Sequence, residues 1–309
     1  MHQMYQAKHL SRSAFIPIRN LNYHVRVWGE PGPGKTPLVL LHGWMDVAAS
    51  FQFMVDALQQ DHFVIAPDWR GFGLTQSGGV DTFWFPDYLA DLDALLDLFA
   101  PGMQVNLVGH SMGGNVAMLY AGIRPERIFR LINLEGFGMP ATVPEQAPGR
   151  FTHWLDEVKH FHKGAMKLKT YDSLQAVALR LMKTNRRLGA DKAHWLASHW
   201  AAETTPGQWT ILGEAAHKIS NAQLYRVEEV LAIYRCISAP MLMVEAQDDS
   251  LAYWFKGKFT LQQHRERMQS VAKLELVVVP DCGHMLHHDQ PQSVAALMES
   301  FLVGGHPKV

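Results

Sequence analysis

Cysteine is scarce in this chain, which has 309 residues and only two cysteines, Cys236 and Cys282. Two cysteines do not form a disulfide framework in a chain of this length, which favours a reducing compartment. Residues 1–13 lack the apolar core of a secretory signal and carry His, Gln and Lys throughout. No run approaches the ~20 apolar residues that would span a bilayer. We therefore expect a soluble, cytoplasmic protein with no membrane partner.

An excess of one charge is also lacking, since 28 basic and 29 acidic residues leave a formal net charge of −1. Nucleic acids and anionic membranes call for a basic excess or patch, so neither is an expected partner. The apolar fraction is 48% and the charged fraction 18%, as in ordinary globular proteins. The length allows one large α/β domain or two ordinary ones.

The order of apolar runs predicts an α/β fold with a mostly parallel sheet and helices on both faces. Several runs are continuously apolar, as strands covered on both sides should be. The first two expected strands would form an antiparallel hairpin at the sheet edge. The expected strands are 14–18, 23–28, 38–41, 63–66, 105–108, 128–134, 241–245 and 274–279, and the expected helices are 50–60, 86–99, 112–123, 260–270 and 291–302.

Residues 141–236 interrupt this alternation. They show no buried-strand pattern and are helical in character, with tryptophans scattered among Lys, Arg and His. Prolines near residue 140 mark the entrance to the segment. The sequence therefore predicts a helical cap subdomain at 141–236, inserted into a core domain formed by 14–140 and 237–303.

Ser111 is the expected nucleophile. It lies in Gly109-His110-Ser111-Met112-Gly113, after an apolar strand and before a helix. A serine at such a strand-to-helix turn adopts strained backbone angles and exposes its hydroxyl. The free N–H groups and positive dipole end of the helix point toward the serine oxygen.

A serine needs a base, and His284 is the best candidate. It follows the strand 274–279, at the edge where open α/β sheets carry their ligands. His287 and His288 lie nearby and are alternatives. No acidic or thiolate partner at ligand spacing accompanies these histidines, so a metal site is not expected there.

The third member should be a carboxylate that orients the imidazole. Asp249, in the loop after the strand 241–245, is the first choice because the order serine, acid, histidine is the one this architecture uses. Asp248 is its neighbour and nearest alternative. Glu135, at the end of the strand 128–134, is the other candidate.

Backbone amides should stabilise the oxyanion. The amide of Met112, directly after the nucleophile, is one candidate. The amide of Trp44 is the other, in the loop that follows the strand 38–41, where Gly43 lets the backbone turn close to the substrate.

Together these residues resemble the α/β-hydrolase fold family, in particular its serine-hydrolase-like and bacterial carboxylesterase branch. The resemblance is carried by His42-Gly43, the loop 68–73, Gly-His-Ser-Met-Gly-Gly at 109–114, and Gly283-His284. It implies an eight-stranded sheet, a cap between strands six and seven, and a bracing role for Asp68 and Arg70. Glu135 is similarly placed to the acid of some haloalkane dehalogenases, but those enzymes use an aspartate nucleophile.

The expected reaction is acyl transfer from a small or medium, largely apolar carboxylic ester to water, with no metal or cofactor. The expected pocket residues are Trp44, Met45, Phe137, Met139 and Met285. Three alternatives stay open: carbon–carbon bond hydrolysis of a vinylogous diketone with the same triad, peroxide-dependent side chemistry, and a non-catalytic ligand-binding member of the fold.

Overall fold

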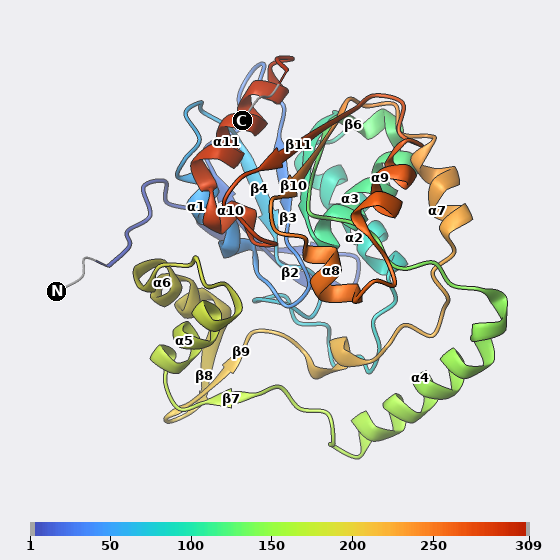
Figure 1. The fold of residues 1–309 in the computed structure, drawn as a ribbon. Helices are drawn as coiled ribbons and strands as arrows, with labels where there is room; N and C mark the ends of the chain where they lie inside the picture. Colours follow the sequence, from blue (N-terminus) through green and yellow to red (C-terminus); the bar gives the residue numbers. More distant parts are fainter. Residues whose placement is uncertain (1–3, 307–309) are drawn as a thin grey trace.

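The computed structural model describes residues 4–306 and has an eight-stranded sheet at its centre (Figure 1). The strand order is β1-β2-β4-β3-β5-β6-β10-β11; β1 and β2 are antiparallel, as are β2 and β4, and the remaining pairs are parallel. The mostly parallel sheet is therefore confirmed, with the expected hairpin at its edge. The strands are β1 Arg12–Ile18, β2 Leu21–Trp28, β3 Leu38–Leu41, β4 Val64–Pro67, β5 Val105–His110, β6 Ile128–Leu134, β10 Met241–Ala246 and β11 Leu274–Val279.

Helices cover both faces of the sheet, because its strands are apolar on both sides. In β3, Val39 and Leu41 join one hydrophobic core while Leu38 and Leu40 join the other. Helices on the first face are α2 Pro86–Phe99, α3 Met112–Ile123, α7 Val227–Tyr234 and α9 Leu261–Met268; those on the second are α1 Gln52–Val55, α10 Leu286–Asp289 and α11 Pro291–Leu302. The helix expected at 50–60 is shorter, since the 3-10 helix η1 Ala48–Phe51 precedes α1 and the helical segment ends at Val55.

The predicted cap extends to residue 236, but α7 lies within that range and packs against the sheet. We call the preceding residues 141–226 the insertion; this segment is not purely helical. Its helices are α4 Ala147–His162, α5 Leu174–Thr184 and α6 Ala190–Trp200, followed by the 3-10 helix η4 Ala215–Lys218. A three-stranded antiparallel sheet, ordered β7-β9-β8, accompanies them; its strands are β7 Thr170–Tyr171, β8 Ala201–Thr205 and β9 Gln208–Ile211. These strands are short and half-exposed, so they lack the continuous apolar run by which the central strands were recognised.

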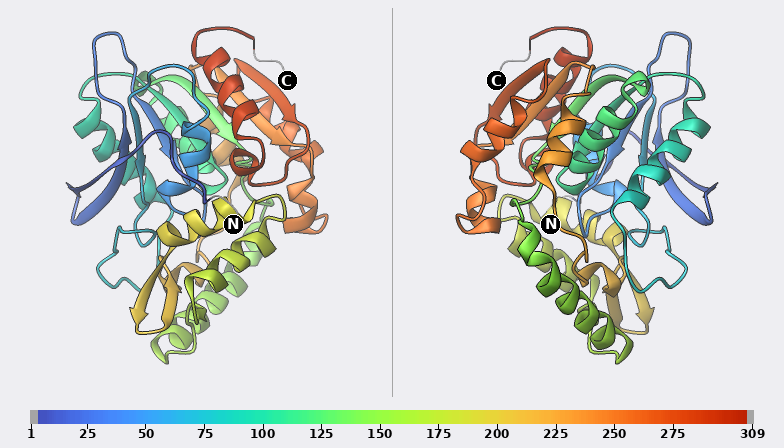
Figure 2. Two further views of the ribbon diagram at one scale, coloured as in Figure 1. Left: turned by 90° about the vertical axis from the view of Figure 1, so that its left-hand side faces the viewer. Right: turned by 90° about the vertical axis from the view of Figure 1, so that its right-hand side faces the viewer.

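The insertion gathers on one side of the sheet, below it in both views of Figure 2. Its own small core includes Val177 and Leu196, which cluster with Val47 and Phe53 from the segment after β3. The Gly73 amide also donates to the Leu212 carbonyl at 2.9 Å. The insertion is thus packed against the loops that follow β3 and β4. Within residues 4–306, no helix combines the length and apolarity needed to cross a membrane.

Candidate active site

Ser111 lies at a strained turn between β5 and α3. Its backbone angles are φ 53° and ψ −116°, a conformation that costs a non-glycine residue energy. The turn is held because the Ser111 amide donates to the Leu134 carbonyl at 2.9 Å, while the Asn115 amide donates to the Ser111 carbonyl at 3.0 Å. The surrounding sheet and helix therefore fix the direction of the serine side chain.

Gly113 shows why this turn needs glycine. A Cβ at this position would lie 2.1 Å from the carbonyl oxygen of Leu41 in β3. That close approach of helix to strand leaves no room for a methyl group. The glycine lets α3 begin directly beside the end of β3, where the loop 42–46 starts.

Ser111 and His284 come together although 173 residues separate them. His284 Nε2 lies 2.9 Å from the Ser111 hydroxyl oxygen, and its Nδ1 lies 3.3 Å from Oε2 of Glu135. One neutral tautomer satisfies both contacts, with Nδ1–H donating to the carboxylate and Nε2 accepting from the hydroxyl. The structure thus connects a serine, a histidine and a carboxylate through two successive contacts of the His284 ring.

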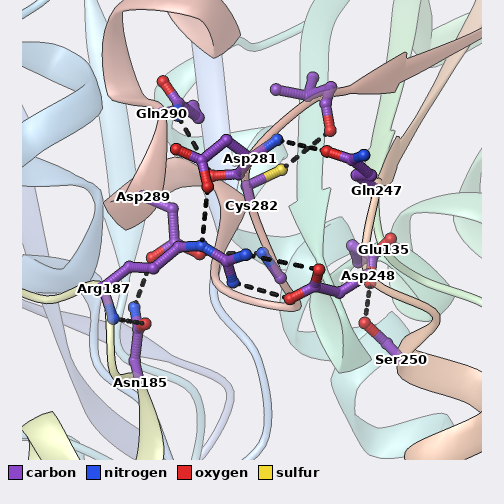
Figure 3. Close-up of polar contacts among 12 residues, drawn as sticks. Glu135, Asn185, Arg187, Gln247, Asp248, Ser250, Asp281, Cys282, Asp289 and Gln290 are labelled. Atoms are coloured by element: carbon purple, nitrogen blue, oxygen red, sulfur yellow. Dashed lines mark hydrogen bonds and ion pairs between the residues drawn. The ribbon is translucent and has the colours of Figure 1, made fainter.

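Glu135 is buried and held by two further donors. The Ala246 amide donates to its Oε1 at 2.7 Å, and the Ser250 hydroxyl donates to its Oε2 at 2.6 Å. Figure 3 shows the Ser250 contact at the start of α8 Ser250–Phe255. Three donors around one carboxylate offset the cost of burying its charge. Glu135 also has a positive φ of 58°, which turns the chain sharply at the end of β6.

The preference for Asp249 over Glu135 as the partner of His284 is wrong for this structure. Asp249 is the N-cap of α8, and its carboxylate accepts from the Ala252 amide at 2.9 Å. Asp248 is also elsewhere, since it pairs with Arg187 of the insertion at 2.7 Å. Of the three acids considered from the sequence, the structure brings only Glu135 to His284.

The loop that carries His284 is tied to the insertion by residues that the sequence did not single out. Arg187 reaches Asp248 and also Asp281, the latter at 3.3 Å (Figure 3). The Asn185 amide group donates to Asp289 at 2.7 Å, and Asp289 in turn accepts from the Gly283 amide at 2.9 Å. No local motif marks Asn185 or Arg187, because their partners lie 61 to 104 residues away.

The loop after β3 closely approaches Ser111. A Cβ on Gly43 would lie 3.2 Å from the Ser111 Cβ, so the backbone here runs directly beside Ser111. His42 holds the loop: its Nδ1 donates to the Gly43 carbonyl at 2.8 Å, and its Nε2 accepts from the Trp69 amide at 2.9 Å. Burial lowers the pKa of His42 to about 4, so the ring stays neutral in this arrangement.

Asp68 and Arg70 are built into the framework around this loop. Asp68 accepts from the Ala48 amide at 2.7 Å and lies 2.7 Å from Nδ1 of His24. Arg70 Nε donates to buried Asp91 at 2.6 Å. Both side chains are buried and paired, in keeping with the bracing role that the family resemblance implied.

The expected pocket residues differ in their surroundings. Trp44 is 50% exposed and Met139 is 46% exposed, while Met45 and Met285 are partly buried. Phe137 is buried instead, with its ring edge-on to His264 at a centroid distance of 4.9 Å. Phe137 therefore belongs to the core more than to an open surface.

One group of side chains has the composition of a metal site. Asp46, His110 and His287 are buried, and each offers a ligand atom within 4.8 Å of the others. Burial raises the pKa of Asp46 to about 7, since its carboxylate lacks enough compensating donors.

Comparisons with known proteins extend over most of the chain. A family model described as alpha/beta hydrolase fold matches residues 36–291. The chain is 25% identical over 285 residues to a serine hydrolase-like protein of Danio rerio, covering 90% of this chain and 84% of that protein. It is 25% identical over 280 residues to 2-hydroxy-6-oxo-2,4-heptadienoate hydrolase of Pseudomonas putida, covering 88% and 91%. The solved structure of a hypothetical protein from Pseudomonas aeruginosa matches with a TM-score of 0.81 at 24% identity, over 94% of this chain and 99% of that one.

Proposed function

From the premise that this chain belongs to the α/β-hydrolase fold family, we propose that it is a serine hydrolase of carboxylic esters with Ser111, His284 and Glu135 as its triad. The observation that carries the proposal is the contact of 2.9 Å between the Ser111 hydroxyl and His284 Nε2, at a strained turn. A nucleophile and base within hydrogen-bond reach, with the base oriented by a third group, are the signature of nucleophilic catalysis.

In the proposed first step, the Ser111 oxygen attacks the ester carbonyl carbon while His284 Nε2 takes the hydroxyl proton. The tetrahedral intermediate collapses, its carbon–oxygen bond to the alcohol breaks, and the alcohol leaves with the proton from His284. Water then attacks the acyl-enzyme, again giving a proton to His284, which returns it to Ser111 as the acid departs. Glu135 stays ionised and stabilises the imidazolium in both steps.

We assign the oxyanion hole to the backbone amides of Met112 and Trp44. Met112 begins α3, so its amide is one of the unpaired donors at the helix N-terminus. Gly43 brings the loop that carries Trp44 beside Ser111. Each such donor is worth about 3 kcal/mol of transition-state stabilisation.

A small to medium, largely apolar ester is the proposed substrate. Exposed Trp44 and Met139, together with partly buried Met45 and Met285, supply apolar and adaptable surface near the triad segments. A panel of nitrophenyl esters of graded acyl length tests this, with kcat/KM expected to peak at an intermediate length. A profile that favours charged acyl groups would contradict it.

A fluorophosphonate probe tests the chemistry without knowledge of the substrate. We expect labelling of Ser111 in the folded protein, and its loss in Ser111→Ala and His284→Ala. A folded wild-type protein that resists labelling would instead support a non-catalytic, ligand-binding role.

Carbon–carbon bond hydrolysis is the second candidate. One relative, which matches 88% of this chain, is a 2-hydroxy-6-oxo-2,4-heptadienoate hydrolase. The same triad serves both reactions in this proposal. Turnover of a 2-hydroxy-6-oxodienoate with little activity on nitrophenyl esters would favour this second function over esterase activity.

A further inference from the structure

Three buried polar atoms near Ser111 lack hydrogen-bond partners among the described residues. Asp46 Oδ2, His110 Nδ1 and His287 Nδ1 have no hydrogen-bond partner among residues 4–306. Asp46 follows the loop beside Ser111, His110 immediately precedes Ser111, and His287 lies in α10. These three residues are also the ones whose ligand atoms lie within 4.8 Å of each other. Buried polar atoms nearly always have a hydrogen-bond partner, so three unpaired atoms in one place indicate that a partner is missing.

The hydrogen bonding of His110 shows what kind of partner is needed. Its Nε2 lies 2.7 Å from the main-chain oxygen of His284, which can only accept, so Nε2 carries the proton. In the neutral ring with its proton on Nε2, Nδ1 presents a bare lone pair, and this atom has no partner among the described residues. The carboxylate of Asp46 likewise presents lone pairs. Two electron-rich atoms facing one buried space call for a positive centre between them.

We propose that Asp46, His110 and His287 bind a divalent transition-metal ion of the zinc class. Two imidazoles and one carboxylate form a typical nitrogen and oxygen ligand set for Zn²⁺. Metal-bound histidines usually donate their other ring N–H to a carbonyl, carboxylate or hydroxyl, which fixes the tautomer. His110 already donates in this way to the His284 carbonyl, and His287 Nε2 lies 3.4 Å from the Ser50 hydroxyl.

No sequence motif marks this site, since the acid lies far from the histidines along the chain. Asp46 comes from the loop after β3, His110 from the end of β5 and His287 from α10. The ligands meet only because these segments converge at the same edge of the sheet. All three are buried, with Asp46 the most exposed at 7%.

A bound ion would inhibit the hydrolase, and this consequence rests on the proposed function. The rings of His110 and His284 are 4.9 Å apart between centroids, which puts the dication close to the imidazole that must become positively charged. The ion would also pull on the three segments that hold Ser111, His284 and the oxyanion amides. Zn²⁺ should therefore lower kcat more than it changes KM.

The test begins with binding, which needs no turnover. Chelator-treated protein is titrated with Co²⁺, and we expect one tight equivalent with the intense visible absorption of a low-coordinate ion. Asp46→Asn and His287→Gln should each weaken binding by tenfold or more, whereas His153→Ala, which removes an exposed histidine near Glu157, should not. A Co²⁺-loaded crystal should show the anomalous peak between the three side chains. Equal binding by all variants, or a peak elsewhere, would overturn the site and leave a proton or a water as the partner.

The activity measurement is separate. Inhibition of wild-type turnover by Zn²⁺ that is relieved in Asp46→Asn supports the regulatory role, and tight binding with unchanged kcat refutes that role alone. If no ester or dienoate is turned over, the proposed function fails while the Co²⁺ titration still decides the site.

Discussion

At the scale of single residues, one backbone angle helps determine which acid contacts His284. Glu135 adopts a positive φ at the end of β6, and this directs its carboxylate toward Nδ1 of His284. The carboxylate of Asp249 instead caps the N-terminus of α8. Asp249, the first choice from the sequence, and Glu135 therefore have different physical tasks.

Glu135→Gln should lower kcat by about 10³ to 10⁴-fold, because an amide cannot stabilise the imidazolium and favours the wrong tautomer. The matched change Asp249→Asn should leave kcat within about twofold, since asparagine caps a helix as well as aspartate does. Steady-state kinetics on the best ester of the panel measures both. Full activity in Glu135→Gln combined with a large loss in Asp249→Asn would return the role to Asp249.

The sequence was informative for this site wherever chemistry depends on a local motif. Ser111 was identified because its turn needs glycines at fixed spacing between a strand and a helix. His284 followed from its place after the strand 274–279. The choice of acid was not accessible, since it depends on a φ angle and on donors from Ala246 and Ser250, which no spacing along the chain reveals.

At the scale of elements, the start of α3 shows how packing overrides helix propensity. Alanine is ordinarily about 1 kcal/mol better than glycine inside a helix. At Gly113, however, the added Cβ would overlap the Leu41 carbonyl of β3, a backbone group that cannot move without displacing the strand. The junction of β3 and α3 therefore depends on a residue that would be a poor choice in an isolated helix.

Gly113→Ala should destabilise the protein by roughly 2–4 kcal/mol through this overlap. Gly149→Ala in α4 is the control, because its Cβ would meet nothing within 4 Å; it should stabilise by about 0.5–1 kcal/mol. Urea unfolding of both variants measures the difference. Similar small effects in the two would mean that the sheet yields easily at Leu41.

The small sheet of the insertion shows where apolar patterns fail to predict strands. Its helices were expected, but its small sheet was not, because β8 and β9 are half-exposed and short. The one local signal was Pro206-Gly207 between two threonine-containing runs, which is typical of a hairpin turn. Patterns of burial identify strands in a core, while strands at a surface must be read from their turns.

Arg187 joins the insertion to the loop of His284, and its loss should act locally. Arg187→Met should change the free energy of unfolding by less than about 1 kcal/mol, because its ion pairs are partly exposed. It should nevertheless speed amide hydrogen exchange in residues 281–289 several-fold, since one of their links to the insertion is gone. The adjacent exposed Arg186→Met is the control. Equal exchange in both variants would show that Asn185 and Asp289 hold the loop alone.

At the scale of the whole molecule, the mostly parallel sheet and the helices on both of its faces followed from the alternation of apolar runs and helices. What the sequence did not indicate is how many of its 17 histidines are interior. Among residues 4–306, burial lowers the pKa of seven histidines: His42, His110, His199, His217, His264, His287 and His288. Several serve as neutral hydrogen-bonding groups around the triad, so the framework of the site depends on their staying uncharged.

This makes the fold sensitive to acid. A histidine whose pKa is lowered in the folded state takes up its proton mainly on unfolding, so its contribution to stability is present above the unfolded pKa and is lost as pH falls. His264 is a clear case, with a pKa of about 4 in the folded protein against 6.5 for the free side chain. The raised pKa values of Asp46 and Asp289 act in the opposite direction, but these are two groups against seven. The free energy of unfolding should therefore decline between pH 6.5 and pH 4.

His264→Leu should make that decline shallower. The ring of His264 lies edge-on to Phe137 and Phe259, so an apolar side chain suits its surroundings. Each proton taken up on unfolding costs about 1.4 kcal/mol per pH unit, and the variant removes one such proton. Urea unfolding of both proteins at half-unit steps from pH 7 to pH 4.5 measures the slopes in chelator-containing buffer. Because both curves share every other buried histidine, a gap that widens steadily toward acid assigns the difference to residue 264, and parallel curves would mean that this ring is already protonated in the folded protein.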